Sequence, residues 1–230
     1  MARKFVSNKD VTIRLFKNDV MEFLSRVHPS VPLLVFMPIV AALFFHSATA
    51  LDYVWTDIVV WCIFGLMVWT FAEYGLHRFV FHFKPVGPWT ERLHFLAHGV
   101  HHDYPMDSKR LVMPPLISVP LASLFYLLFL TLFGRHAPPI TAGFLTGYMI
   151  YDMTHYAIHH FNMHSPFWLA VKNHHLRHHF QDSGKGFGVS LPFWDLVMGT
   201  AFPAKGLAKL KTSEDLDRDL HDQSPNVLTN

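Results

Sequence analysis

The chain has 230 residues, of which 51% are hydrophobic and 16% are charged, and its formal net charge is +2. Soluble domains carry about 25% charged residues, so this chain is short of surface charge, and the absence of a basic face excludes a nucleic-acid-binding protein. The single cysteine excludes a disulfide framework and a thiolate metal site. Histidine is the outlier, with 18 copies against 17 for Asp and Glu together. This composition predicts a membrane protein with a histidine-based metal centre.

The first 26 residues alternate charged and apolar side chains. They lack the apolar core of a signal peptide. An alternation of this kind is typical of an amphipathic segment at a membrane surface. We therefore predict a cytosolic or interfacial N-terminal segment over residues 1–26.

Four runs without Lys, Arg, Asp or Glu follow, over residues 27–51, 58–72, 111–134 and 136–151. A spanning helix needs about 20 mostly apolar residues, so the first and third runs are long enough alone. The second and fourth are shorter, but each continues into a histidine-bearing segment that can extend the helix. The fold class predicted is an all-α integral membrane protein with about four transmembrane helices in two hairpins, in a membrane domain of residues 27–200.

The positive charges predict the orientation. If the runs form two hairpins, 18 of the 19 Lys and Arg lie on one side, and only Arg135 lies on the other. The side rich in Lys and Arg is the cytosolic side, and it contains both termini. The membrane is that of the endoplasmic reticulum in a eukaryote and the inner membrane in a bacterium. Residues 201–230 are polar and are expected to be a partly disordered tail.

Histidine clusters lie in the predicted cytosolic segments. Positions three and four apart share a helix face, so the members of three clusters are expected to project together. His77 and His82 are five apart and diverge by about 140° on an ideal helix, which requires a helix end, a bulge, or a metal approached from two sides. The other clusters are His98, His101 and His102; His155 and His159; and His175, His178 and His179.

Neutral imidazole binds iron, zinc, copper and nickel. These ten histidines exceed what one ion accepts, whereas two ions with four to six ligands each use all of them. No catalytic residue beyond these metal ligands is identified. Eight histidines remain outside the set. His28, His46, His136 and His221 are expected to have no role, and the roles of His94, His160, His164 and His174 stay open.

Other metal chemistry is disfavoured by the residues between the histidines. A zinc protease needs a glutamate after the first histidine of its helix, and the segment from His155 to His159 has no carboxylate. A carboxylate di-iron bundle needs two Glu-x-x-His motifs, and only Glu91 to His94 fits. An all-histidine dinuclear site at the membrane surface remains, in a histidine-rich helical cap on the cytosolic side.

Longer motifs surround the clusters and resemble the fatty acid 2-hydroxylase branch of the fatty acid hydroxylase/sterol desaturase superfamily. The resemblance runs from about Glu73 to Thr200. It is carried by His98-Gly-Val-His101-His102-x-x-Pro105-Met106-Asp107-x-x-Arg110-Leu111-Val112-x-Pro114-Pro115, by Tyr151-Asp152-x-Thr154-His155-Tyr156-x-x-His159-His160, by Gly186-Phe187-Gly188-Val189 and by Phe193-Trp194-Asp195.

The resemblance implies an O₂-dependent di-iron monooxygenase of lipid metabolism that hydroxylates C2 of a fatty acyl chain, free or held in ceramide. Iron is the expected metal, and zinc can replace it in purified protein. The His-Pro-Gly-Gly motif of a fused cytochrome b5 domain is absent, so the short form is expected, with electrons from a separate donor such as cytochrome b5 or ferredoxin. The metal ligands implied are His77, His82, His98, His101, His102, His155, His159, His175, His178 and His179.

Supporting roles and alternatives are also expected. Asp107 and Arg110 are expected to pair, and Asp152 and Asp195 to orient ligand imidazoles. The alternatives are a sterol or carotenoid hydroxylase or a desaturase of the same superfamily, a membrane metal-binding or transport protein without redox turnover, and a structural membrane protein. The acyl carrier, chain length, stereochemistry, electron donor and oligomeric state are not determined by the sequence.

Overall fold

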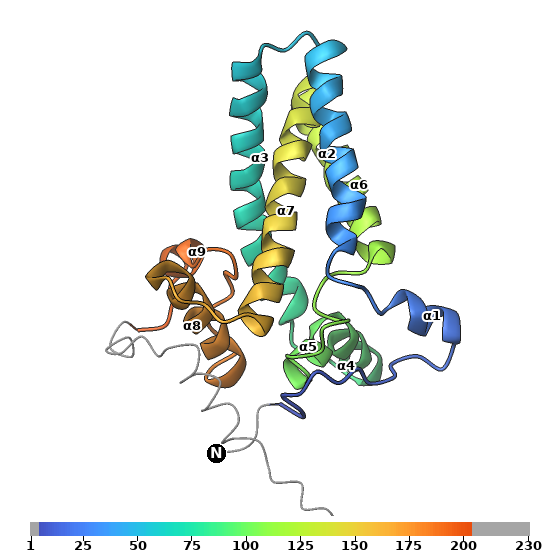
Figure 1. The fold of residues 1–230 in the computed structure, drawn as a ribbon, viewed down its shortest axis with the longest axis vertical. Coiled ribbons are helices and arrows are strands. Elements are labelled where there is room, and N and C mark those ends of the chain that lie inside the picture. Colours follow the sequence, from blue (N-terminus) through green and yellow to red (C-terminus); the bar gives the residue numbers. More distant parts are fainter. Residues whose placement is uncertain (1–4, 204–230) are drawn as a thin grey trace, which may run out of the picture.

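The computed structural model describes residues 5–203, so most of the predicted tail, with His221, lies outside the described residues. Every regular element within them is a helix, which confirms the all-helical prediction (Figure 1). Four long helices stand together as a bundle, and the short helices gather at one end of it, which we call the cap. The bundle helices are α2 (Val31–Thr49), α3 (Trp55–Gly75), α6 (Pro115–Phe133) and α7 (Ala137–His160).

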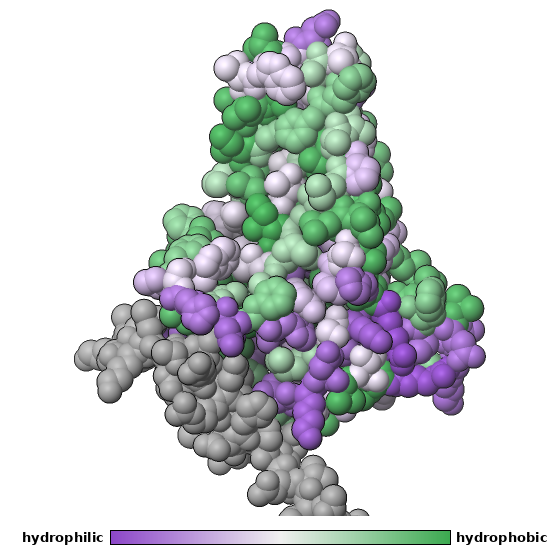
Figure 2. All heavy atoms as spheres, viewed as in Figure 1, coloured by the Kyte–Doolittle hydropathy of each residue, from purple (hydrophilic) through white to green (hydrophobic). Residues whose placement is uncertain are grey.

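Within residues 5–203, three helical stretches are long and apolar enough to cross a membrane. Their side chains give the bundle a mainly hydrophobic outer surface, while hydrophilic residues gather around the cap (Figure 2). A bundle whose apolar side chains face outward is stable in lipid rather than in water. The stretches are Val31–Thr49, Trp55–Phe81 and Pro115–His160.

The third stretch contains two antiparallel helices. A 3₁₀ turn, η3 (Gly134–His136), joins α6 to α7, and Gly134 has a φ of +54° there, a conformation that glycine adopts at no steric cost. The ring of Phe144 in α7 packs on Phe125 and Phe129 of α6, with centroids 4.6 and 5.3 Å apart. The pair therefore forms a hairpin, as α2 and α3 do (Figure 1).

Helix α7 is the centre of the bundle, and most of its residues are buried. It lies in backbone contact with α3 at two glycines. A Cβ atom on Gly143 would stand 1.9 Å from the carbonyl oxygen of Cys62, and one on Gly65 would stand 1.9 Å from that of Ile140. Small residues permit such close approach, which brings the histidine-bearing ends of α3 and α7 together.

The cap contains two π-helical segments that interrupt or extend its α-helices. The first, η1, continues α3 directly, and the second, η2, lies between α4 and α5. Two further helices close the cap, and α1 lies at its edge. The bounds are α1 (Asp19–Leu24), η1 (Leu76–Phe81), α4 (Pro88–His94), η2 (Phe95–Gly99), α5 (Val100–Asp103), α8 (Pro166–Phe180) and α9 (Phe193–Val197).

The N-terminal segment is tied to the cap by a buried ion pair. Arg110 donates to Oε1 of Glu22 at 2.7 Å, and both side chains are buried. Glu22 also accepts from the backbone N–H groups of Leu15 and Phe16 at 2.9 and 3.0 Å. The predicted pairing of Arg110 with Asp107 is present at 3.6 Å. The sequence reasoning missed Glu22, whose buried partner Arg110 lies 88 residues away in the chain.

Candidate metal centre

The structure brings all ten predicted histidines together in two groups of five. Within each group one nitrogen per side chain lies within 4.8 Å of the others. We call them group one and group two. Group one contains His77, His82, His98, His102 and His178, and group two contains His101, His155, His159, His175 and His179.

The distances between Nε2 atoms suit metal ligation. In group one, Nε2 of His178 lies 3.0 Å from that of His82 and 3.2 Å from that of His102. In group two, Nε2 of His175 lies 3.0 Å from those of His159 and His179. Two nitrogens bound at right angles to one ion at about 2.05 Å stand about 2.9 Å apart. The spacing is therefore that of neighbouring ligands around one cation.

Hydrogen bonding alone does not satisfy group one. His82, His102 and His178 approach one another pairwise, with Nε2 distances of 3.0 to 3.2 Å. A neutral imidazole has one donor and one acceptor nitrogen. Nδ1 of His178 faces the carbonyl oxygen of Lys185 at 2.7 Å, so its Nε2 is an acceptor. His82 and His102 can both donate to it, but their two N–H groups then face each other. A cation among the three removes this conflict.

The groups divide the clusters of the sequence, which corrects the expectation that each cluster projects together. His101 lies in group two, whereas His98 and His102 lie in group one. His178 likewise lies in group one while His175 and His179 lie in group two. Adjacent helical residues point about 100° apart, so α5 and α8 each pass between the two groups and supply ligand atoms to both.

A π-helix resolves the unusual spacing of His77 and His82. The backbone N–H of His82 donates to the carbonyl of His77, five residues earlier in the chain, at 3.1 Å. Such bonds define a π-helix, and π-helical turns often occur at functional sites. The wider turn brings the two rings to a centroid distance of 5.0 Å. The spacing of five was a signal in the sequence for this bulge.

Backbone carbonyls orient two of the rings in group one. Nδ1 of His77 donates to the carbonyl of Phe187 at 2.6 Å, as Nδ1 of His178 does to that of Lys185. A hydrogen bond at Nδ1 leaves Nε2 without a proton, which is the form that binds a metal. Both carbonyls belong to the loop between α8 and α9. This loop therefore sets the direction of two imidazoles.

Two carboxylates hold that loop. Asp195 accepts from the N–H groups of Phe187 and Gly188 at 2.9 and 2.8 Å. Glu73 of α3 accepts from those of Val189 and Ser190 at 2.7 and 2.8 Å. The ring that Asp195 contacts is His174, at 3.1 Å, not one of the ten. The expected role of Asp195 is therefore corrected from direct contact with a ligand to support of the loop.

Burial keeps the cap imidazoles neutral. Removal from water, together with the neighbouring histidines, lowers the pKa of His98, His101, His102, His175 and His179 well below the usual range. The same causes lower the pKa of His82 to about 3. Burial also lowers the pKa of His178, to about 4, although its bond to Lys185 opposes the shift. Neutral imidazoles are the ligands a divalent metal needs at pH 7.

An apolar crevice lies within the bundle, above the cap. Its polar groups are few. Ser118 and Tyr148 line it, and their hydroxyls are buried without a hydrogen bond to any described residue. Asp152, one turn along α7 from Tyr148, likewise has an oxygen without such a bond. The crevice is lined by Trp69, Leu76, Met113, Ser118, Leu121, Ala122, Phe125, Phe144, Leu145 and Tyr148.

The histidines outside the ten make other contacts. The ring of His94 meets Phe83 edge to face at a centroid distance of 5.4 Å, and His174 pairs with Asp195. His136 stacks against Trp61 at the far end of the bundle. His160 lines a polar pocket and His164 an open groove. None of the five belongs to either group.

An apolar helical bundle capped by two buried groups of histidines defines a membrane metalloprotein. The sequence matches the fatty acid hydroxylase family model over residues 62–200. This chain belongs to the fatty acid hydroxylase family.

Known proteins similar to this chain carry related descriptions. It is 39% identical over 199 residues to dihydroceramide fatty acyl 2-hydroxylase FAH2 of Arabidopsis thaliana, covering 85% of this chain and 83% of the relative. It is 45% identical to the ceramide very long chain fatty acid hydroxylase SCS7 of Saccharomyces cerevisiae, covering 66% of this chain and 40% of that one. It is 36% identical to fatty acid 2-hydroxylase of Homo sapiens, covering 84% and 58%.

A solved structure has the same fold. It is described as full-length scs7p with only the hydroxylase domain visible. The TM-score is 0.73 at 39% sequence identity, with 82% of this chain and 71% of that chain covered. The likeness therefore extends through the bundle and the cap.

Proposed function

We propose that this protein is a membrane di-iron monooxygenase that inserts a hydroxyl group at C2 of a fatty acyl chain. The chain is carried as a free fatty acid or as the N-acyl chain of a ceramide-type sphingolipid. One observation carries the proposal: ten histidines gather in two groups of five, each of which could hold a metal ion, at one end of an apolar bundle, in a chain of the fatty acid hydroxylase family. Hydroxylation balances as one C–H bond, O₂, two electrons and two protons giving one C–OH group and water.

The proposed metal ligands are the ten histidines, five for each of two ions. Each set offers imidazole nitrogens only, which suit iron and also accept zinc. Bound iron supplies the oxidising power to break an unactivated C–H bond, which no amino-acid side chain provides. The electrons come from a separate redox protein, such as a cytochrome b5 or a ferredoxin. The ligands are His77, His82, His98, His102 and His178 for one ion, and His101, His155, His159, His175 and His179 for the other.

The protein's own contribution is to hold the substrate and exclude water. We propose that the acyl chain enters the bundle at the apolar crevice, where side chains must move apart to admit it, and that the hydroxyls of Ser118 and Tyr148 donate to the polar head. A head held at a fixed depth places the C–H bond of C2 near the ions, whereas the tail extends among the apolar side chains. Positioning of this kind accounts for a large share of enzymatic rate enhancement.

The four long helices support a proposal for the membrane arrangement. We place α2, α3, α6 and α7 across the bilayer, with the cap and both termini in the cytosol, where the Lys and Arg residues gather. At the edge of the cap, Phe23 of α1 and Leu196 of α9 are 77% and 70% exposed. Such side chains suit the interface, where they enter the outer part of the leaflet. The membrane is the endoplasmic reticulum in a eukaryote or the inner membrane in a bacterium.

Lipid mass spectrometry tests the function. A host expresses the wild type, His101→Ala, His178→Ala and the control His164→Ala, whose exposed ring lies outside both groups. We expect acyl chains with one added oxygen at C2 in the wild type and the control, and none in the two other variants. Chains lacking two hydrogens would instead indicate a desaturase. Iron analysis is expected to find two ions per chain in the wild type; protein without metal contradicts an oxygenase.

A further inference from the structure

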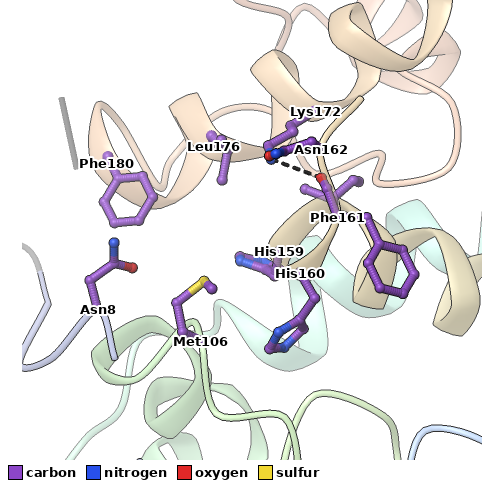
Figure 3. Close-up of a pocket in the computed structure, with 10 residues that line it drawn as sticks. Asn8, Met106, His159, His160, Phe161, Asn162, Lys172, Leu176 and Phe180 are labelled. Carbon is purple, nitrogen blue, oxygen red and sulfur yellow. Dashed lines mark hydrogen bonds between the residues drawn. The ribbon is translucent and has the colours of Figure 1, made fainter. Parts of the chain in front are cut away.

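A second cavity, which we call the polar pocket, lies beside group two on the cap side. It has a volume of about 200 Å³ and shares no lining residue with the apolar crevice. Its walls come from the end of α7, from α8, from the loop after α5 and from the N-terminal segment. Figure 3 shows its main lining residues, with the imidazole of His159 reaching toward the space between Met106 and Leu176.

Two residues of the pocket wall each have a buried polar atom without a hydrogen bond to any described residue. These atoms are Oδ1 of Asn8 and Nε2 of His160. Lys172, also in the wall, is 1% exposed and donates to the carbonyl of Phe161 at 3.1 Å. That bond fixes the segment at the mouth of the pocket, where Phe161 and Asn162 are exposed. The pocket therefore runs from an exposed mouth to a buried floor at His159.

Five of the ten residues that line the pocket are polar, and a cavity of this size suits water; they are Asn8, His159, His160, Asn162 and Lys172. A site holds water when it is roomy enough and offers each molecule two to four polar partners. The pocket offers water both the room and the polar partners.

The proposed hydroxylation needs such a passage. It consumes two protons and releases one water for each hydroxyl group formed, while the crevice that holds the acyl chain is apolar. The group-two ligands are buried, and among the described cavities the polar pocket is the one lined by one of them, His159. We propose that the polar pocket is the hydrated route by which protons reach the metal centre and product water leaves. This inference rests on the proposed function.

Thiol labelling tests whether the pocket is reached by water, without turnover. In a Cys62→Ala background in lipid nanodiscs, Met106→Cys places a thiol in the pocket wall, and the matched control Met113→Cys places one in the apolar crevice. The probe is a positively charged, membrane-impermeant methanethiosulfonate reagent, and intact mass is the readout. We expect Met106→Cys to react at least about tenfold faster than Met113→Cys. Equal or slower reaction overturns the proposal.

Filling the pocket tests its role in the reaction. Met106→Trp narrows the pocket from its wall, and Asn162→Trp narrows it from its exposed mouth. If one variant does not fold, the other still provides the test. With two irons per chain retained, we expect kcat to fall about tenfold and KM for the acyl substrate to stay unchanged. A raised KM with unchanged kcat assigns the pocket to the lipid head and overturns the proposal, as does no change. If the wild type hydroxylates nothing, the proposed function fails, while the labelling result still decides water access.

Discussion

Each imidazole at the metal centre has one nitrogen for the ion and a second that can fix the ring. His77 and His178 use the second nitrogen on backbone carbonyls of Phe187 and Lys185. His155, His175 and His179 have a buried Nδ1 without a hydrogen bond to a described residue. Two rings of group one are therefore oriented by a loop, whereas these three rings of group two are held by packing. Orientation of a ligand by its neighbours commonly changes metal affinity.

The buried carboxylate of Glu22 makes folding pH-dependent. Burial raises its pKa, but the N–H groups of Leu15 and Phe16, with Arg26 and Arg110, outweigh burial and lower the pKa to about 2 from 4.5. A lowered folded-state pKa contributes stability above pH 4.5 that is lost as the pH falls from 4.5 to 2. We expect Glu22→Gln to cost about 3 kcal/mol at pH 7, measured by denaturant unfolding in detergent.

The same measurement at pH 2 separates charge from packing. There Glu22 is about half protonated in the folded state and almost fully protonated in the unfolded state, so the difference between wild type and Glu22→Gln is expected to shrink to about 0.4 kcal/mol. Asp19→Asn is the control, because Asp19 pairs with Arg14 while both side chains are exposed and exposed pairs contribute little. A Glu22→Gln deficit that is the same at pH 2 and pH 7 would contradict the assignment.

At the scale of elements, the two π-helices give the histidine side chains directions that an ideal α-helix would not. In η1 the wider turn puts His77 and His82 on one side. In the second segment, η2 ends at Gly99 and α5 begins at the next residue. His98 and His102 then lie in group one, and His101 lies in group two. The spacing of five hinted at the first π-helix. The second left no signal, because a spacing of three and four fits an α-helix equally well.

The contact of α3 with α7 depends on Gly143. An alanine Cβ at this position would stand 1.9 Å from the carbonyl oxygen of Cys62, so the helices must separate. We expect Gly143→Ala to cost about 1–3 kcal/mol and to lower iron content, because the ligands at the ends of both helices move apart. Thermal unfolding and metal analysis measure both effects.

Gly75 provides a control, because alanine is expected to raise the stability there rather than lower it. It lies at the end of the same helix α3 with a helical φ of −65°, and a Cβ there meets no atom within 4 Å. Gly75→Ala should therefore stabilise by about 0.5–1 kcal/mol through helix propensity. Equal effects at Gly143 and Gly75 would show that backbone contact is not what holds the pair.

At the scale of the whole molecule, the two proposed ions would cross-link the ends of α3 and α7 to the cap. Each group takes ligands from segments that lie far apart in the sequence. An ion that binds only the folded state stabilises it by about 2.7 kcal/mol at a hundredfold excess over its Kd. For two ions in a chain of this size, chelation is expected to lower Tm by about 10 °C or more.

Variants of the ligand sets check this expectation. His101→Ala in group two and His178→Ala in group one are each expected to reduce the Tm difference between iron-loaded and chelated protein. His164→Ala, outside both groups, should keep the full difference. If chelation leaves the Tm of the wild type unchanged, the two groups are not linked to folding through an ion.

Much of the site was visible in the sequence. The excess of histidine, the helical spacing and the charge-free runs were sufficient to name ten residues that the structure brings together. The Asp107–Arg110 pair was also predicted. The missed residues were Glu22, Glu73 and Lys172, whose partners are backbone groups or lie far along the chain. Local patterns carry no information on such distant partners.

The sequence by itself determined the helical class, the apolar segments and the chemistry of the ligands, because hydrophobicity and imidazole are properties of each residue and its near neighbours. Only the tertiary structure decided which histidine faces which ion. His101 and His102 are adjacent in the sequence yet belong to different groups. Their division depends on the π-helical turns, on the glycine contact between α3 and α7, and on the loop held by Asp195. These are long-range packing contacts, and they exist only once the chain has folded.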